Sequence, residues 1–381
     1  MVFNIPHSTL HTLAERPLMK ILRNILIFAL SLIIVLYLAT KLLEPKYTDI
    51  REGNMVSEYY SGEKDHQVLF VGDCELYENV SPVELWRQYG ITSYIRGSAQ
   101  QLIWQSYYLL EDTLKYETPK VVVFNVLSMK YNEPQKEAYN RMSIDGMPLS
   151  LAKIRDIEAS KVAGEDTASY LFPLLRYHDR WKDLSWNDVK YLFSRPKVTI
   201  NGFMMRNDVK PVDWIPDAQP LADYNFGPTA WEYLDKMRDL CKSKGIQLML
   251  VKAPSLYPFW YAQWDQQIAD YAKANGLIYK NMLVSKAPGD MTPAQALPEI
   301  GLDYSADTYD GGLHLNCAGA EKLSDYLGKI LQTSYFLPDL RSDSKEAAIW
   351  KPKVAAYDKW KQLQLQEIAD TGKVQTFFVP G

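Results

Sequence analysis

The chain has 381 residues, enough for one large domain or two small ones, and its 47% hydrophobic and 23% charged residues are typical of a globular protein. Three cysteines are too few for a disulfide framework. The net charge is −4: residues 1–43 carry +3, from basic residues at 16, 20, 23 and 41 against Glu15, so residues 44–381 carry −7. An acidic body of this kind has no electrostatic footprint for nucleic acid.

The most hydrophobic segment runs from Ile21 to Leu43, and between Ile25 and Ala39 its only polar residue is Ser31. A segment of this length can span a bilayer about 30 Å thick. No small-x-small cleavage site follows it, which favours an uncleaved single-pass anchor in the cell membrane over a signal peptide. The basic residues that precede it predict a cytoplasmic leader, residues 1–20, and place the rest of the chain outside the membrane.

After a predicted tether, residues 44–66, strands and helices alternate along the chain. Apolar runs such as Val68–Val71 predict strands that are buried on both faces. Ser81 and Pro82, with Glu84 after them, predict a capped helix start. The strands are predicted at 68–71, 92–97, 120–126, 246–251 and 277–282, and the helices between and after them end near residues 90, 116, 244, 274 and 331. This alternation predicts an α/β domain with a parallel sheet and right-handed crossovers.

The domain is expected to cover residues 67–333, with an interruption at residues 127–225 that holds polar and aromatic segments and no strong strand. We interpret this stretch as an insertion on the catalytic side of the sheet. Its most distinctive piece is residues 171–181, which is either a helix packed on the domain or a lid that faces substrate or membrane. The C-terminal tail, residues 334–381, suggests no function.

Cys74 follows Gly72 and Asp73, on the turn just past the carboxyl end of the first strand. In open α/β sheets this edge is where ligands bind. A nucleophile on a strand-to-helix turn is exposed beside free backbone N–H groups that can stabilise an oxyanion. Free cysteine is also among the most buried residue types, so Cys74 is either a nucleophile or a packing residue.

The sequence around Cys74 resembles the first block of the SGNH/GDSL hydrolases, which have Gly-Asp-Ser at this place; here cysteine replaces the serine. The family's second block, a glycine after the second strand, is matched by Gly97, and its third-block asparagine loosely by Asn125. The resemblance implies a three-layer α/β/α, flavodoxin-like domain with a five-stranded parallel sheet, here preceded by one transmembrane helix. It also implies an oxyanion hole made by the Cys74 and Gly97 N–H groups and the Asn125 amide. A polar strand end bonded to a neighbouring loop is the alternative for Asn125.

Of the five histidines, only His178 and His314 can approach Cys74, because the others lie in the leader or at the opposite end of the sheet. His314 precedes the last helix, at the expected catalytic edge. The family's last block has an aspartate three positions before its histidine, whereas Asp310 lies four before His314. Asp307 is a rival acid, and either carboxylate would orient the imidazole. A structural role in the loop is the alternative for His314.

Within the family, the anchor, topology and size look most similar to the D-alanyl transfer proteins of teichoic-acid D-alanylation and related envelope acyltransferases. That resemblance implies a Cys74–His314–Asp310 acyltransferase or esterase that acts on a cell-envelope polymer, beside a membrane-bound O-acyltransferase, with no cofactor and no metal. The alternative is an inactive subunit that binds carbohydrate or acts as a scaffold. Lys130 and Lys252 follow strand ends and would either meet an anionic substrate or remain solvated.

Overall fold

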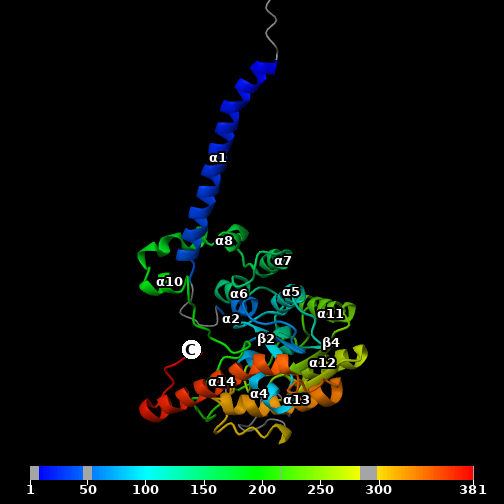
Figure 1. Cartoon of the computed structure of the whole chain (residues 1–381). Helices are drawn as coiled ribbons and strands as arrows, with labels where there is room; N and C mark the ends of the chain where they lie inside the picture. Colours follow the sequence, from blue (N-terminus) through cyan, green and yellow to red (C-terminus); the bar gives the residue numbers. More distant parts are fainter. Residues whose placement is uncertain (1–7, 46–53, 216, 284–297, 381) are drawn as a thin grey trace, which may run out of the picture. The chain divides into compact units, whose positions relative to one another are not determined.

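The computed structural model describes residues 8–45, 54–215, 217–283 and 298–380, with side chains from residue 17 onward. The chain divides into two compact units (Figure 1). The first combines residues up to 46 with residues 171–195, and the second holds residues 47–170 and 196–381. The leader and tether were predicted partly at residues 1–7 and 46–53, which lie outside the described residues.

The first unit contains the long helix α1 (Ser8–Leu43) and three short helices: α9 (Leu174–Tyr177), η3 (His178–Lys182) and α10 (Trp186–Lys190). Within α1, the stretch Pro17–Leu43 is long and apolar enough to cross a membrane, and none of it is buried along its most apolar window. This agrees with the position of the predicted anchor; its orientation in a membrane stays a prediction.

The second unit is built on a parallel five-stranded sheet, as predicted. Its strands are β1 (Val68–Gly72), β2 (Ser93–Gly97), β3 (Val121–Asn125), β4 (Gln247–Lys252) and β5 (Ile278–Asn281), in the order β2-β1-β3-β4-β5. Gly72 pairs with Gly97 and Val71 with Phe124, so neighbouring strands end together. Residues that follow the strands therefore meet at one edge of the sheet.

Helices cover both faces of this sheet. Figure 1 shows α5 and α11 on one face and α4 and α13 on the other. The remaining helices of the chain are α2 (Met55–Tyr60), α3 (Cys74–Tyr77), α4 (Pro82–Tyr89), α5 (Ile103–Thr113), η2 (Val126–Lys130), α6 (Glu137–Ile144), α7 (Leu151–Ser160), α8 (Thr167–Leu171), α11 (Pro228–Ser243), α12 (Ala262–Asn275), η4 (Pro298–Ile300), α13 (Cys317–Tyr335) and α14 (Ser344–Thr371).

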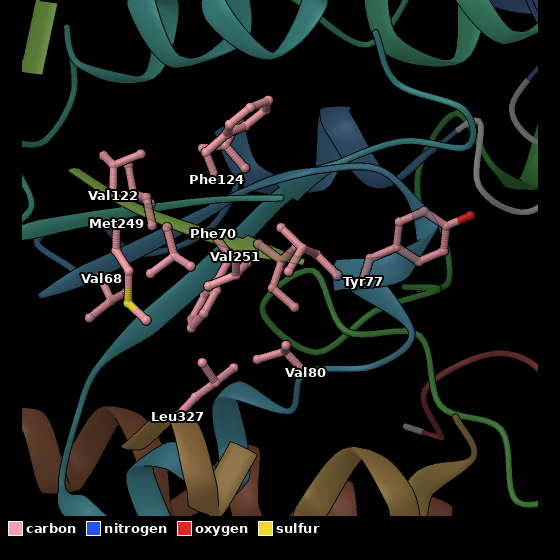
Figure 2. Close-up of a cluster of buried hydrophobic side chains, with 14 of the residues drawn as sticks. Val68, Phe70, Tyr77, Val80, Val122, Phe124, Met249, Val251 and Leu327 are labelled. Carbon is pink, nitrogen blue, oxygen red and sulfur yellow. The ribbon is translucent and has the colours of Figure 1, made fainter. Parts of the chain in front are cut away.

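The core lies between the sheet and these helices. Phe70 and Val251 of the strands, Val80 after α3 and Leu327 of α13 belong to one cluster of buried apolar side chains (Figure 2). Each is fully removed from solvent. Because β1, β3 and β4 are apolar at successive positions, they fit a sheet that is buried on both faces.

Helix α4 begins and ends where the sequence predicted. The Ser81 side chain accepts a hydrogen bond from the Glu84 N–H, Pro82 is the first helical residue, and Gly90 adopts a left-handed conformation with φ of 64° after the last turn. The reciprocal bond of a capping box is absent from α4, because Ser324 Oγ accepts the Ser81 N–H instead. That contact fixes the start of α4 against α13.

Residues 334–381, and the described part of residues 44–66 after residue 53, belong to the same compact unit as the sheet. In α14, Trp350 stacks on Trp86 of α4 with ring centroids 5.3 Å apart, and Tyr357 and Trp360 are also buried. In α2, within the predicted tether, Tyr59 is fully buried. Both stretches carry aromatic residues that would otherwise expose large apolar surfaces.

The stacked pair predicts the stability contribution of α14. Trp350→Ala should lower the free energy of unfolding by about 3–5 kcal/mol, because it removes a buried indole and leaves a cavity against Trp86. Trp214→Ala is the matched control, since Trp214 is 70% exposed. Chemical denaturation of both variants measures the difference. Equal stabilities would show that α14 adds little to the unit.

Candidate active site

Cys74 is the first residue of α3, directly after β1. The Asp73 side chain caps α3 by accepting a hydrogen bond from the Glu75 N–H at 3.2 Å. The turn needs glycine before it, because a Cβ on Gly72 would lie 3.1 Å from the Asn125 Cβ. The Cys74 side chain is half-buried and makes no disulfide. Cys74 therefore lies at the carboxyl edge of the sheet, where the sequence placed it; its role as a nucleophile stays a prediction.

His314 is held by Asp310. The His314 Nδ1 atom lies 2.7 Å from Asp310 Oδ2, and the His314 backbone N–H donates to Asp310 Oδ1 at 2.8 Å. The extra residue between the two is thus accommodated by a carboxylate that binds both backbone and ring. Asp307, the rival acid, instead accepts bonds from Lys322 Nζ at 2.6 Å and from the Asp303 N–H at 2.7 Å.

A second carboxylate reaches the same imidazole nitrogen. Glu78 Oε2 lies 3.2 Å from His314 Nδ1, and the Tyr309 hydroxyl donates a hydrogen bond to Glu78. The Tyr309 ring also stacks on His314. Glu78 was not predicted from the sequence, although it lies four positions after Cys74, a spacing that places both residues on one face of a helical turn.

Cys74 and His314 act on each other electrostatically. Burial raises the pKa of the Cys74 thiol, and His314 opposes this shift. Burial lowers the pKa of His314, but Glu78, Cys74 and Asp310 outweigh it and raise that pKa well above its ordinary value. His314 Nε2 is buried and makes no hydrogen bond of ordinary geometry to the described residues. Because the carboxylates engage Nδ1, Nε2 is the nitrogen left to interact with the thiol.

Glu75, the residue after Cys74, belongs to a buried ion pair. Lys252 Nζ is 2.9 Å from both carboxylate oxygens of Glu75, and both side chains are fully buried. Lys252 also donates to the Ala253 carbonyl. Lys252 is therefore neither solvated nor exposed for substrate, the two roles that the sequence suggested, and it instead joins the ends of β1 and β4.

Asn125 completes this network at the end of β3. Its amide nitrogen donates to Glu75 Oε2 at 2.9 Å and to Asp73 Oδ1 at 3.1 Å, and its oxygen accepts the Ala253 N–H. Both amide hydrogens are thus engaged by carboxylates, as in the alternative of a strand end bonded to neighbouring loops. These contacts do not support the oxyanion role, which stays a prediction.

Two further ionisable groups, the carboxyl of Asp73 and the ammonium of Lys130, lie within electrostatic reach of Cys74. Burial and the neighbouring Glu75 raise the pKa of Asp73 to about 6, against the opposing effects of Asn125 and the lysines. The pKa of Lys130 lies below its ordinary value, because burial outweighs the opposing effects of Asp73, Glu75 and Cys74. Lys130 is half-buried, and of the two lysines predicted near substrate it is the one within electrostatic reach of the thiol.

The other predicted residues occupy different surroundings. Gly97 ends β2 opposite Gly72, and a Cβ there would lie 2.8 Å from the Gly72 carbonyl oxygen, so only glycine fits. His178 belongs to the first unit, where its side chain is 65% exposed. Among the described residues, no cluster of three or more His, Cys, Asp or Glu could hold a metal ion.

The sequence matches no protein-family model and no curated protein. The structure is similar to a candidate acylhydrolase from Bacteroides fragilis (12% identity, 73% of this chain, 95% of the other, TM-score 0.37). It is also similar to a candidate lipolytic protein of the G-D-S-L family from Desulfitobacterium hafniense (12%, 71% and 100%, TM-score 0.33) and to a GDSL-like lipase from Bacteroides thetaiotaomicron (13%, 74% and 99%, TM-score 0.34).

The buried ion pair gives a prediction about stability. Lys252→Met should lower the free energy of unfolding by about 3–5 kcal/mol, because it leaves the Glu75 carboxylate buried without its cation. The double variant Lys252→Met/Glu75→Gln should lose less, since no uncompensated charge remains. Denaturant unfolding of the two variants and wild type measures this. A double variant at least as unstable as the single one would contradict the assignment of the cost to the unpaired charge.

Glu78 gives a prediction about pH. Glu78 raises the pKa values of both Cys74 and His314, so Glu78→Gln should shift the pH profile of Cys74 alkylation toward lower pH. Iodoacetamide alkylation followed by mass spectrometry measures the profile at Cys74, because Cys241 and Cys317 are buried. Glu133→Gln is the control, since Glu133 is exposed. A Glu78→Gln profile that coincides with wild type would contradict this electrostatic role.

Proposed function

We propose that this protein is a thiol-dependent acyltransferase or esterase. The observation that carries the proposal is the imidazole of His314, which Asp310 holds by Nδ1 at 2.7 Å while its buried Nε2 remains for Cys74. A nucleophile, a base and a carboxylate that orients the base are the three parts of a triad for acyl transfer. They come here from the loops after β1 and before α13.

The proposed reaction has two halves. His314 Nε2 takes the Cys74 proton, the sulfur attacks the ester carbonyl carbon, and a C–S bond forms. The tetrahedral intermediate collapses as the C–O bond breaks, and His314 returns the proton to the leaving alkoxide. An acceptor hydroxyl or water then attacks the thioester, His314 takes its proton, the C–S bond breaks, and the proton returns to the thiol.

The negative charges around His314 would stabilise the imidazolium that forms during this reaction. Asp310 and Glu78 both face Nδ1 and favour the protonated ring. The N–H groups of Cys74 and Gly97 are the proposed oxyanion donors, and Lys130 is a cation within reach of the same region. Since the pKa values of the thiol and the imidazole are both raised, we expect the reactive form to accumulate on the alkaline side of neutrality.

The proposed substrate is an acyl group on a cell-envelope polymer, such as a teichoic acid or a polysaccharide, outside the membrane. Two features support this: the apolar stretch Pro17–Leu43 of α1, and the resemblance of the predicted anchor, topology and size to envelope acyltransferases. A membrane-bound O-acyltransferase is the proposed partner, because an anchored enzyme would receive or deliver acyl groups at the membrane surface.

A binding or scaffolding subunit is the second candidate. One observation favours it: burial raises the pKa of the Cys74 thiol, which lowers the fraction of thiolate near neutral pH. In such a subunit the fold would be retained for recognition of carbohydrate, and Cys74 would not become acylated. The two candidates thus differ in whether a covalent intermediate forms.

The nucleophile is tested with three proteins. Wild type treated with an activated acyl ester should carry an adduct on the Cys74 peptide. Cys74→Ser should lose at least about tenfold in the single-turnover rate, about 1.4 kcal/mol of barrier, because a hydroxyl must lose its proton during attack whereas a thiol ionises more readily. Cys74→Ala should lose more. Quenched-flow mass spectrometry measures all three rates.

Two results would overturn the proposal. Equal rates for the serine, alanine and wild-type proteins would show that Cys74 is not the nucleophile, and no adduct at any pH from neutral upward would favour the binding subunit. A serine variant as fast as wild type would show instead that the thiol is incidental. His314→Ala, which removes the proposed base, should also lose rate, whereas the matched control His178→Ala, in the first unit, should keep the wild-type rate.

A further inference from the structure

The end of α1 is covered by a separate segment of the chain. Side chains from Pro17 to Leu38 are exposed, whereas Ala39, Thr40 and Leu43 are half-buried. The cover comes from residues 171–195, which we call the collar segment and which form one compact unit with α1. Arg180 Nη1 donates a hydrogen bond to the Leu43 carbonyl oxygen at 2.6 Å, so the collar segment caps the last turn of the helix.

The position of this contact along α1 corresponds to a particular depth in a bilayer. The 17 residues between Arg23 and Lys41 carry no charge. At about 1.5 Å per residue they span roughly 26 Å, close to the thickness of a hydrocarbon core. Burial by the collar segment begins at Ala39, where that span ends. A helix that crosses the membrane therefore holds the collar segment at the boundary between acyl chains and headgroups.

The collar segment exposes an unusual amount of apolar surface. Trp186 is 78% exposed and Phe193 is 87% exposed. The complete set of its exposed large apolar side chains is Phe172, Leu175, Trp181, Trp186, Leu192 and Phe193. Six such residues within 25 positions mark an interaction surface, because soluble surfaces rarely gather them.

The polar residues of the collar segment suit the same boundary. It contains five basic residues, at 176, 180, 182, 190 and 195, and three aspartates, giving +2 in a chain whose net charge is −4. Aromatic rings with basic side chains beside them are enriched where a bilayer meets water, since the rings enter the interface and the cations meet lipid phosphates.

We propose that the collar segment lies in the headgroup layer of the bilayer that α1 spans, with Trp181 and Trp186 inserted at the boundary of the acyl chains. The occupant of this surface is a phospholipid bilayer. Trp181 lies in η3 and Trp186 in α10, both within the unit that holds α1. The inference is independent of the acyl-transfer proposal, because it rests on no residue of that site.

Tryptophan fluorescence of the full chain in nanodiscs tests this directly. The chain has ten tryptophans and α1 has none, so quenching by lipids brominated on the acyl chain, close to the headgroup, reports on segments outside α1. Wild type should be quenched. Trp181→Ala/Trp186→Ala should lose at least about two thirds of that quenching, since interfacial indoles lie nearest the bromines. Trp214→Ala is the matched control, because Trp214 is also exposed, at 70%, and lies in the second unit.

The outcomes separate the proposal from its rivals. No quenching of wild type, or quenching that the double variant retains, overturns it. The proposal is also overturned if the fluorescence lost in the double variant is the part that aqueous iodide quenches. That result would mean that Trp181 and Trp186 face water or a protein partner. The removed indoles are exposed, so an unchanged melting temperature shows that the double variant is folded. If it does not fold, the less disruptive Trp181→Phe/Trp186→Phe pair is measured in the same way.

Discussion

The carboxyl ends of three strands, β1, β3 and β4, are joined by one buried carboxylate. Glu75 follows the candidate nucleophile directly, and its charge is balanced by Lys252 and bonded by Asn125. Three strands thus end on a single group that water does not reach. An unpaired charge there would cost several kcal/mol, so the three strand ends are held in one arrangement. The position of Cys74, one residue away, follows from that arrangement.

In the candidate site two carboxylates face a single imidazole, whereas at the strand ends one carboxylate faces one lysine. Asp310 and Glu78 both face one nitrogen of His314, and only the protonated ring satisfies both. The Tyr309 hydroxyl donates a hydrogen bond to Glu78, and the Tyr309 ring stacks on His314. Together these contacts restrict the orientation of the imidazole. Negative charge is therefore concentrated at Nδ1, which favours the protonated ring, and in the proposed reaction Nε2 is the nitrogen that exchanges a proton with Cys74.

The features that could be predicted from the sequence are those that depend on a local pattern of residues. The strands were predictable from their apolar runs, and the locations of Cys74 and His314 from their places beside a strand end and a helix start. Asp310 was one of two candidate acids, and the catalytic roles of all three residues stay predictions. Glu78, Tyr309 and the buried state of Lys252 were not predicted, because a charged side chain shows no burial in its own sequence and each depends on partners from distant loops. The helix α14 was missed although Trp350, Tyr357 and Gln364 recur every seven positions, a spacing that indicates one buried helical stripe.

The C-terminal helix has a consequence for the order in which the chain folds. Arg87 of α4 is paired with Asp358 of α14, 271 positions later in the sequence. The Trp86 ring beside it cannot be covered until α14 has been synthesised and, on the proposed topology, moved across the membrane. Long-range closure of this kind is slow compared with local helix formation. A chain that has not yet placed α14 would expose this indole face, so completion of the fold waits for α14.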